Sequence, residues 1–252
     1  MEYCRGNMKI FVTEDYDAMS CTCAEFMAAQ IKAKPCTVLG LATGSTPIGT
    51  YKELIRMHKA GEADFSGVTT FNLDEYYPIQ KSNDQSYDYF MREQLFNHVN
   101  IDLARVNIPN GEAADIAAEC NRYEAAIKAA GGIDFQILGI GLNGHIGFNE
   151  PDEVFAAKTH QVTLDESTIK ANARFFASQN EVPRQAVTMG IGTIMMAKTV
   201  LLMINGAKKA EIAKKTILGS ITPNVPASVL QLHQNVLVVL DKDAAEALVP
   251  CL

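Results

Sequence analysis

Residues 135–151 read FQILGIGLNGHIGFNEP, and this stretch says most about the fold of the chain. Its first part, Phe135 to Ile140, is apolar without alternation, as in strands that are buried on both faces of a parallel sheet. The glycine-punctuated part that follows carries His145 and Glu150 beyond the end of that strand. Because open α/β sheets bind ligands beyond the carboxyl ends of their strands, we expect chemistry in this loop.

Two other apolar stretches end in the same way. Residues 68–77, VTTFNLDEYY, run from β-branched and aromatic residues into the paired carboxylates Asp74 and Glu75. Residues 38–55, VLGLATGSTPIGTYKELI, lead from an apolar strand into an amphipathic helix through four polar or small residues, Thr43, Gly44, Ser45 and Thr46. Three polar strand ends predict one shared pocket.

The remainder of the chain alternates strands with helices. We expect a strand from Met8, a short one near Val106 and two more in residues 199–204 and 236–240. Helical spacing predicts helices in residues 15–34, 47–60, 87–99, 113–130, 208–218 and 227–233. This alternation predicts an α/β fold, a mostly parallel sheet with helices on both faces. No repeat or linker divides the sequence, so we expect one domain over residues 8–252, with residues 1–7 as an N-terminal extension without a structural role.

Residues 152–186 interrupt the alternation. They are more polar and only weakly periodic, and Arg174 is followed there by two phenylalanines. A long irregular excursion of this kind is often a lid or a binding loop, although an extra surface hairpin is the commoner structural alternative. We expect a lid within residues 152–186, and the sequence leaves the hairpin open.

The composition limits the class of protein. Of the 252 residues, 48% are hydrophobic and 20% are charged, as in a soluble globular protein with a sizeable core. The net charge of −7, without clustered Lys or Arg, argues against a nucleic-acid partner. No apolar run approaches the roughly 20 residues that span a bilayer and no signal-peptide core is present, so we expect no membrane partner and a cytoplasmic location. The six cysteines have neither zinc-site spacing nor disulfide density, so we expect reduced, mostly buried thiols.

The segment from Thr43 to Thr46 has the properties of an anion site. Gly44 permits close approach of the backbone, and free amides at the start of the next helix face the ligand together with the positive end of the helix dipole. A Ser or Thr before Pro is also how many helices simply begin. Lys208 and Lys209 open another helix, where they oppose its dipole; a nearby anion would explain this placement, and so would a solvent-facing pair.

Acid–base chemistry is indicated by His145 and Asp74. A histidine held by a carboxylate suits proton transfer near neutral pH, and His145 has Asn143 and Glu150 as neighbours, although a structural histidine is the simpler interpretation of that residue alone. Asp74 lies among aromatic residues, and partial desolvation would raise its pKa towards that of a useful base. The structural alternative to a catalytic role for Asp74 and Glu75 is that one of them caps a helix or pairs with a lysine.

Two other kinds of site are disfavoured. Residues 139–144, GIGLNG, match the GxGxxG dinucleotide fingerprint, but that motif requires a helix to start within the glycines. Here Gly147, Asn149 and Pro151 indicate an extended loop instead. The candidate acid–base residues include one histidine and no HxH or HxxxH spacing, so a metal site is disfavoured as well.

In order and spacing, six stretches resemble the glucosamine-6-phosphate deaminase family: LATGSTPIGTYKELI, FNLDEYY, SYDYFMREQLFNHVNI, GIGLNGHIGFNEP, NARFF and NGAKKA. The resemblance covers residues 38–240, and the pair FNLDEY and GHIGFNEP is highly specific. It implies a Rossmann-like α/β fold and a hydrolase of amino-sugar catabolism that converts glucosamine 6-phosphate and water to fructose 6-phosphate and ammonia. It implies no redox or nucleotide cofactor, and a small molecule as the partner.

The resemblance also implies roles for residues. Asp74 is the base that takes the C2 proton of the opened sugar, and His145 serves ring opening, positioned with Glu150 and Asn143. The residues implied at the phosphate are Thr43, Gly44, Ser45, Thr46, Lys209 and the lid residue Arg174. Some family members have Asp where this chain has Asn143, and since an amide cannot ionise, we expect hydrogen bonding to His145 or to substrate from it.

Allosterically activated, hexameric members of the family carry basic residues after the NEP motif and a longer C-terminal tail. In this chain the matching region has Glu153, His160 and Val162, and the sequence stops at Leu252. We therefore expect a monomer or small homo-oligomer without allosteric activation.

Two alternative functions deserve comparison. A 6-phosphogluconolactonase shares the fold and a related glycine–histidine loop, but lactone hydrolysis needs no carbon base, so Asp74 argues against it. A sugar-phosphate sensor without catalysis, as in transcription regulators, shares the architecture too, because fold alone does not assign function. Such a regulator should carry a helix-turn-helix, for which the residues before Lys9 leave no room.

Overall fold

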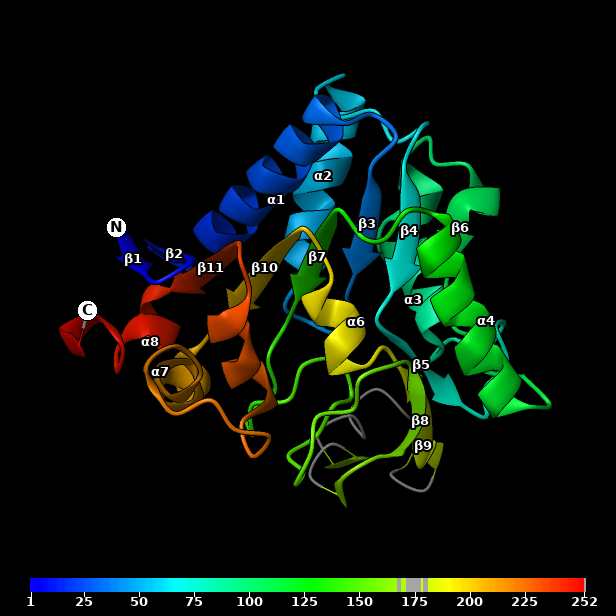
Figure 1. The fold of residues 1–252 in the computed structure, drawn as a ribbon. Helices are drawn as coiled ribbons and strands as arrows, with labels where there is room; N and C mark the ends of the chain where they lie inside the picture. The colour runs from blue at the N-terminus through cyan, green and yellow to red at the C-terminus, as the bar shows by residue number, and fades with distance from the viewer. Residues whose placement is uncertain (167–168, 171–177, 179–180, 252) are drawn as a thin grey trace.

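The computed structural model describes residues 1–166, 169–170, 178 and 181–251 (Figure 1). The strands are β1 (Glu2–Arg5), β2 (Met8–Thr13), β3 (Val38–Leu41), β4 (Thr69–Asn72), β5 (Asp74–Tyr77), β6 (Val106–Asn107), β7 (Phe135–Leu138), β8 (His160–Thr163), β9 (Gln185–Thr188), β10 (Thr199–Ile204) and β11 (Val236–Asp241). The α-helices are α1 (Tyr16–Ala33), α2 (Ile48–Lys59), α3 (Tyr87–Gln94), α4 (Ile116–Ala129), α6 (Ile191–Met195), α7 (Ala210–Leu218) and α8 (Lys242–Ala245). Short 3₁₀-helices are η1 (Phe96–His98), η2 (Leu103–Arg105), η5 (Ala207–Lys209), η6 (Pro226–Leu232) and η7 (Val249–Cys251).

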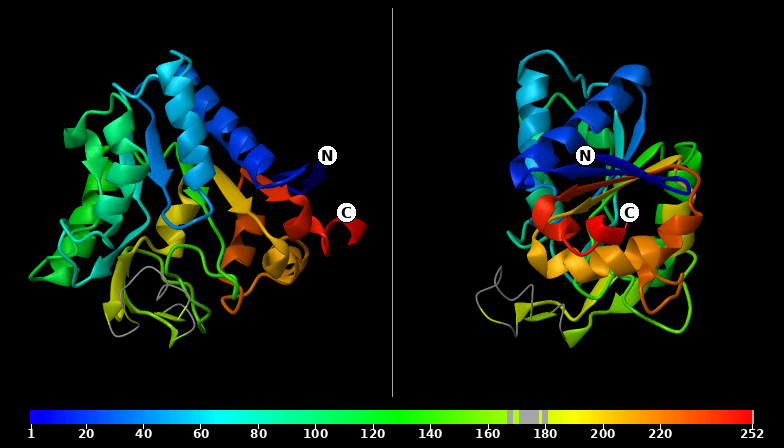
Figure 2. Two further views of the ribbon diagram at one scale, coloured as in Figure 1. Left: turned by 180° about the vertical axis from the view of Figure 1, so that it is seen from behind. Right: turned by 90° about the vertical axis from the view of Figure 1, so that its left-hand side faces the viewer.

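The central sheet has the strand order β1-β2-β11-β10-β7-β3-β4-β6, and all of its neighbours from β2 onwards run parallel. The chain moves across it in one direction from β2 to β6 and returns in the other from β7 to β11. Because parallel crossovers are right-handed, α1, α2 and α3 cover one face while α4, α6 and α7 cover the other (Figures 1 and 2). The predicted α/β fold is confirmed.

The two directions meet where β3 pairs with β7, through Leu39 opposite Phe135 and Gly40 opposite Gln136. A reversal of this kind opens a crevice beyond the carboxyl ends of the two strands, which is where open α/β sheets bind ligands. The loops that follow β3, β4, β7 and β10 all leave the sheet at this edge, since those strands are parallel. The topology therefore brings the three predicted polar strand ends together.

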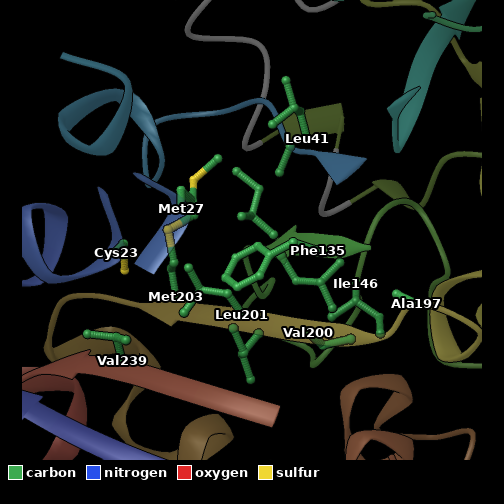
Figure 3. Close-up of a cluster of buried hydrophobic side chains, with 14 of the residues drawn as sticks. Cys23, Met27, Leu41, Phe135, Ile146, Ala197, Val200, Leu201, Met203 and Val239 are labelled. Carbon is green, nitrogen blue, oxygen red and sulfur yellow. The ribbon is translucent and has the colours of Figure 1, made fainter. Parts of the chain in front are cut away.

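A continuous apolar core holds these loops to the sheet. Met27 of α1, Leu41 of β3, Phe135 of β7 and Leu201 of β10 pack in one cluster (Figure 3). Ile146 belongs to the same cluster and is fully buried, although it lies in the loop after β7. Burial of one such side chain contributes about 1.5–3 kcal/mol, which anchors the loop at its middle.

Residues 152–186 contain β8 and the start of β9, which pair antiparallel, and β9 also pairs with β5. The described part of this segment thus contributes to a small antiparallel sheet, β5-β9-β8, beside the main one (Figure 1). This is close to the hairpin alternative. The predicted lid residue Arg174 lies outside the described residues, so the lid stays a prediction.

Three expectations are corrected. The N-terminal residues were expected to have no structural role, but β1 pairs antiparallel with β2, because β2 lies at the edge of the parallel strands and offers unpaired backbone groups. The helices expected over residues 87–99, 208–218 and 227–233 are shorter or partly 3₁₀. The thiols are free, but most are exposed: Cys23 and Cys120 are buried, whereas Cys4, Cys21, Cys36 and Cys251 are not. Cys21 and Cys23 lie on opposite sides of α1 because two residues turn a helix by about 200°.

No described helix combines the length and the apolar character needed to cross a bilayer.

Candidate active site

The loop after β3 forms side-chain hydrogen bonds with residues that follow β10, and its side chains do not cap the helix α2 that follows it. Pro47 is the N-cap of α2, and no side chain caps the helix. The hydroxyl of Thr46 instead donates to Oδ1 of Asn205 at 2.9 Å and accepts from Nζ of Lys209 at 3.4 Å. The ordinary Ser/Thr cap, which the sequence had left open, is therefore wrong. The first turn of α2 keeps the positive end of its dipole turned towards the loop.

Tyr16 of α1 fixes the shape of this loop. Its hydroxyl lies 3.1 Å from the backbone carbonyls of both Ser45 and Thr46, and it accepts a hydrogen bond from the N–H of Gly49 at 2.8 Å. Gly44 has a φ of 94°, a left-handed conformation that glycine adopts without strain. The loop is consequently held in place before any ligand arrives.

Lys208 and Lys209 separate into the two roles that the sequence had left open. Lys208 is exposed, whereas Lys209 reaches the hydroxyl of Thr46. The turn between β10 and η5 is tied down by the buried Asp241, whose two carboxylate oxygens accept from the N–H of Gly206 at 3.0 and 2.9 Å. One lysine thus lies beside the candidate anion site, and it does so on a fixed turn.

The loop after β7 brings His145 and Glu150 into contact. Nδ1 of His145 lies 3.0 Å from Oε2 of Glu150. Asn143 donates to the same carboxylate oxygen at 2.6 Å and accepts from the backbone N–H of His145 at 3.2 Å. Asn143 thus hydrogen-bonds His145, one of the two partners that the sequence had left open. A carboxylate at Nδ1 favours the proton there, which leaves Nε2 of the neutral ring as an acceptor.

Gly141 makes room for the imidazole. A Cβ at this position would lie 2.3 Å from Cε1 and 2.4 Å from Nε2 of His145, closer than real contacts allow. Gly141 therefore leaves space for the ring, and residues 139–150 contain no helix, as expected if the GxGxxG match is a decoy.

Asp74 opens β5 and is 6% exposed. It pairs with Thr188 of β9, and a Cβ on Gly147 would lie 3.6 Å from its Oδ2 and 2.9 Å from the hydroxyl of Thr188. The carboxyl group is therefore adjacent to the His145 loop. Burial, and then the neighbouring charge of Glu75, raise the pKa of Asp74 to about 8, in the direction that the sequence predicted.

The two neighbouring carboxylates serve different purposes. Glu75 is 2% exposed and accepts hydrogen bonds from the backbone N–H groups of Tyr76, Tyr87 and Asp88. The capping alternative is thus correct for Glu75, which meets the first turn of α3. Burial raises the pKa of Glu75 and these three N–H donors lower it, with the first effect larger.

Tyr87 is a site residue that sequence reasoning missed. Its ring stacks on Phe148 of the His145 loop, with 6.1 Å between centroids, and lies 4.8 Å from the ring of Tyr76. Its hydroxyl shares hydrogen bonds with the side chains of Thr43 and Tyr76. A tyrosine in the first turn of a helix carries no sequence signal for this position. Thr188 and Asn205 were also missed, although both end or follow apolar strands and the strand-end rule would have found them.

The printed contacts thus form two groups, Thr46 with Lys209 and Asn143 with His145 and Glu150, and Asp74 lies beside the loop of the second group. The predicted site residue Arg174 lies outside the described residues. Among the residues described, no three His, Cys, Asp or Glu side chains are grouped so as to hold a metal ion.

Comparison with known proteins agrees with this arrangement. The family model described as glucosamine-6-phosphate isomerases/6-phosphogluconolactonase matches residues 14–239. The chain belongs to this family. It is 57% identical over 243 residues to the glucosamine-6-phosphate deaminase of Clostridioides difficile strain 630, covering 96% of this chain and 98% of that protein. It is 58% identical to the deaminase of Thermoanaerobacter sp. strain X514, covering 96% of each.

Solved structures place the chain within the same family. A structure of a monomeric glucosamine-6-phosphate deaminase matches with a TM-score of 0.92 and 47% identity, covering 94% of this chain and 99% of that one. The 6-phosphogluconolactonase of Thermotoga maritima matches with a TM-score of 0.75 at 20% identity, covering 93% of this chain and 100% of that one. The second likeness shows the shared fold alone.

Proposed function

We propose that this chain converts D-glucosamine 6-phosphate and water to D-fructose 6-phosphate and ammonia. The observation that carries the proposal is the buried Asp74, next to a loop in which His145 is held by Glu150. Deamination with isomerisation needs a carbon base and a separate ring-opening group, and these residues supply one each. The names of the relatives that are 57% and 58% identical support the same reaction.

The phosphate would bind first at the loop of residues 43–46, with Lys209 beside Thr46. A lysine and the positive end of α2 both favour a dianion there. Because the phosphate is remote from the reacting carbons, its binding energy would orient C1 and C2 against Asp74. Arg174 is proposed to close over the phosphate from the lid.

Ring opening would then use His145. Nε2 takes the proton of the anomeric hydroxyl as the bond between C1 and the ring oxygen breaks, and the imidazolium formed is stabilised by Glu150. Asn143 holds Glu150 and His145 in this geometry. The imidazolium gives this proton to the ring oxygen as it leaves, so His145 returns to its neutral form and the open-chain aldehyde carries no net change in charge.

Asp74 would then take the C2 proton, which the aldehyde at C1 acidifies. A double bond forms between C1 and C2 while the aldehyde oxygen takes a proton from the ammonium group on C2, which gives an enolamine. Return of the first proton from Asp74 to C1 leaves a protonated imine at C2. Water adds to this imine and ammonia leaves, giving the ketone of fructose 6-phosphate. Asp74 must be ionised for the first of these steps, so its raised pKa matches its strength as a base to neutral conditions.

The test is to incubate the purified protein with glucosamine 6-phosphate and to measure ammonia and fructose 6-phosphate together. We expect equal amounts of both products. A parallel incubation with 6-phosphogluconolactone tests the lactonase alternative, and hydrolysis there without deamination would overturn the proposal. Binding of glucosamine 6-phosphate without turnover would favour the sensor alternative.

We further propose that the enzyme works as a monomer or small homo-oligomer, as a single domain that includes β1, and in the cytoplasm. The monomeric deaminase whose structure matches with a TM-score of 0.92 supports the first point. Sedimentation of the protein against its 27.5 kDa chain mass tests it.

A further inference from the structure

We propose that Glu75 is a positioning residue: its buried carboxylate fastens the first turn of α3 to the strand that carries Asp74, and so holds the Tyr87 ring between the three loops of the site. The inference rests on the proposed deaminase reaction and assigns a role to a group that the reaction itself does not use.

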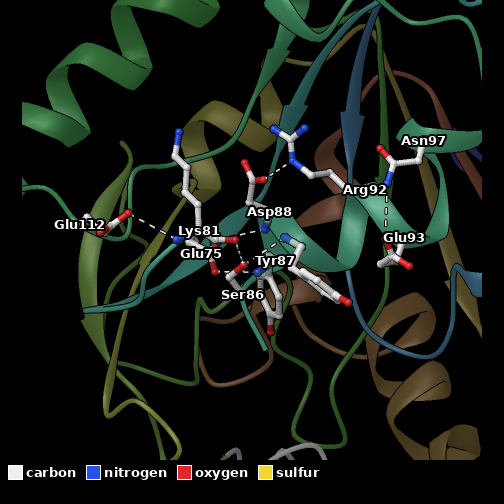
Figure 4. Close-up of polar contacts among 10 residues, drawn as sticks. Glu75, Lys81, Ser86, Tyr87, Asp88, Arg92, Glu93, Asn97 and Glu112 are labelled. Carbon is white, nitrogen blue, oxygen red and sulfur yellow. Dashed lines mark hydrogen bonds and ion pairs between the residues drawn. The ribbon is translucent and has the colours of Figure 1, made fainter. Parts of the chain in front are cut away.

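The contacts of Glu75 join two elements. Oε1 accepts from the N–H of Tyr76 and of Tyr87 at 2.9 Å each, and Oε2 accepts from the N–H of Asp88 at 3.0 Å (Figure 4). The last two donors belong to the first turn of α3, whereas Glu75 and Tyr76 belong to β5. The carboxylate is therefore a link between strand and helix.

Helix stability alone does not explain this link. Ser86 already caps α3, because its hydroxyl accepts from the N–H of Tyr89 at 3.0 Å and donates to the carbonyl of Lys81 at 3.0 Å. Burial of a second carboxylate at the same helix end costs desolvation free energy that an exposed cap avoids. The position of Glu75 is better explained by what α3 carries at its start.

Tyr87 is the first residue of α3, and it contacts three segments of the site: the His145 loop, the strand β5 that carries Asp74, and the phosphate loop. Its ring lies against Phe148 from the His145 loop and Tyr76 from the base strand. Its hydroxyl shares a hydrogen bond with the side chain of Thr43 from the phosphate loop. Displacement of the first turn of α3 would therefore shift the loops relative to one another.

Glu75 has a second, electrostatic effect that makes its role measurable. Among the described residues, the titratable groups facing Asp74 are Glu75 on β5, Tyr87 on α3 and Tyr123 on α4. Burial raises the pKa of both phenols well above 10, so they stay uncharged at working pH. Thr188 and Gly147, which approach Asp74 from β9 and the His145 loop, are neutral. Glu75 is thus the described group whose charge raises the pKa of Asp74, and Asp88, paired with Arg92 at 2.5 Å, faces Glu75 in turn.

The experiment compares Glu75→Gln with Ser86→Ala, two changes at the same helix end. The glutamine amide would turn a donor towards an N–H of α3, so one link is lost. We expect Glu75→Gln to lower kcat roughly tenfold or more with a smaller change in KM, because misplacement by about 1 Å has effects of this size. The acid limb of its pH–kcat profile should move to lower pH, because the neighbouring charge is gone. Ser86→Ala should retain kcat within roughly twofold and keep the limb in place, since it removes only a cap.

Equal losses of kcat in the two variants, with unmoved acid limbs, would show that Glu75 is only a helix cap. Should Glu75→Gln fail to fold, Tyr87→Leu provides the test instead. This variant should lower kcat without moving the acid limb of the pH–kcat profile. A kcat equal to that of the wild type would overturn the proposal. A carbon-13 NMR titration of the Asp74 carboxyl group in Glu75→Gln reports the same pKa shift without turnover. The wild type could also show no deamination while Glu75→Gln still lowers the pKa of Asp74. In that case the proposed function fails, but the electrostatic interaction between Glu75 and Asp74 is supported.

Discussion

At the scale of single residues, Asp74 combines a chemical assignment with a cost in stability. Its pKa is raised from 3.8 to about 8, so the folded protein holds the neutral carboxyl group more readily than the unfolded chain does. The contribution of this group to stability is therefore complete below about pH 4, declines as the pH rises and is lost above about pH 8.

We predict that Asp74→Asn abolishes both deamination and solvent exchange of the C2 proton, while substrate binding is largely kept. The same variant should be more stable than the wild type at pH 8 and above, because it removes the ionised buried group. Activity assays, deuterium exchange at C2 and urea unfolding across pH measure these effects. Asp84→Asn, in an exposed loop, is the control and should change neither. Near-normal C2 exchange in Asp74→Asn would refute the assignment of the base.

Lys209 and Lys208 are neighbours with opposite surroundings, which makes them a matched pair. We predict that Lys209→Met lowers kcat/KM for glucosamine 6-phosphate by roughly 10–100-fold, as expected for a lost hydrogen bond to a charged group. Use of unphosphorylated glucosamine should change much less, because the phosphate supplies the contact. Lys208→Met should leave both substrates unaffected. Equal losses with both substrates would show that Lys209 does not bind the phosphate.

The residues that sequence reasoning found share one property, their place in a segment that leaves an apolar strand. Asp74, His145 and Thr46 lie in the segments that leave β4, β7 and β3. Thr188 is the last residue of β9 and Asn205 the first after β10, so both could have been predicted from their place at a strand end. Tyr87 could not, because its role comes from contacts with Thr43 and Phe148, which lie far away in the sequence.

At the scale of elements, the stretch 68–77 shows what hydrophobic patterning leaves undetermined. It reads as a single strand running into polar residues, yet it divides at Leu73 between two sheets. The N–H of Leu73 donates to the carbonyl of Leu41 in the central sheet, and its own carbonyl accepts from the N–H of Met189, the residue that follows β9 of the small sheet. Alternation predicts which residues are buried but not which strand they pair with. The division matters because it turns Asp74 away from the central sheet towards Thr188.

The opposite end of β7 carries a polar clamp. Asp134, 3% exposed, accepts from Lys34 at 2.6 Å, from Lys198 at 2.8 Å and from the N–H of Val38 at 2.8 Å. Burial alone would raise the pKa of Asp134, but the hydrogen bonds from Lys198, Lys34 and Val38 outweigh it and lower that pKa from 3.8 to about 2. The stabilisation is therefore complete above about pH 4 and is lost as the pH falls towards 2.

We predict that Asp134→Asn lowers the free energy of unfolding at pH 7 by about 1–3 kcal/mol, the range for a buried, charge-assisted hydrogen-bond group. The difference from wild type should shrink at pH 2.5, where the native carboxylate is losing its charge. Urea unfolding at both pH values measures it. Lys198→Ala, which removes a largely exposed partner, should cost about 1 kcal/mol or less. Both variants should retain kcat, because the clamp lies at the end of the sheet away from the site; a large fall in kcat would contradict this separation.

At the scale of the whole molecule, the expected absence of allosteric activation concerns the segment after the NEP motif. The structure has a cavity of about 280 Å³ there, lined in part by Glu150, Asp152, His160, Val162 and Asp165. Three of these five side chains are carboxylates, and the described residues that line the cavity include no lysine or arginine that could bind a phosphate dianion. His160 and Val162 stand where activated relatives are expected to have basic residues.

We predict that N-acetylglucosamine 6-phosphate does not activate this enzyme. An effector shifts a population only if it binds one conformation better than another, and a cavity whose described lining has no lysine or arginine lacks contacts that would create that difference. Initial rates should be hyperbolic in glucosamine 6-phosphate and should stay unchanged when the effector is added. The double variant His160→Arg, Val162→Lys tests whether the cavity is the cause, since it should bind the effector measurably in calorimetry where the wild type does not. Sigmoidal rates that become hyperbolic with effector in the wild type would show that activation survives through other residues.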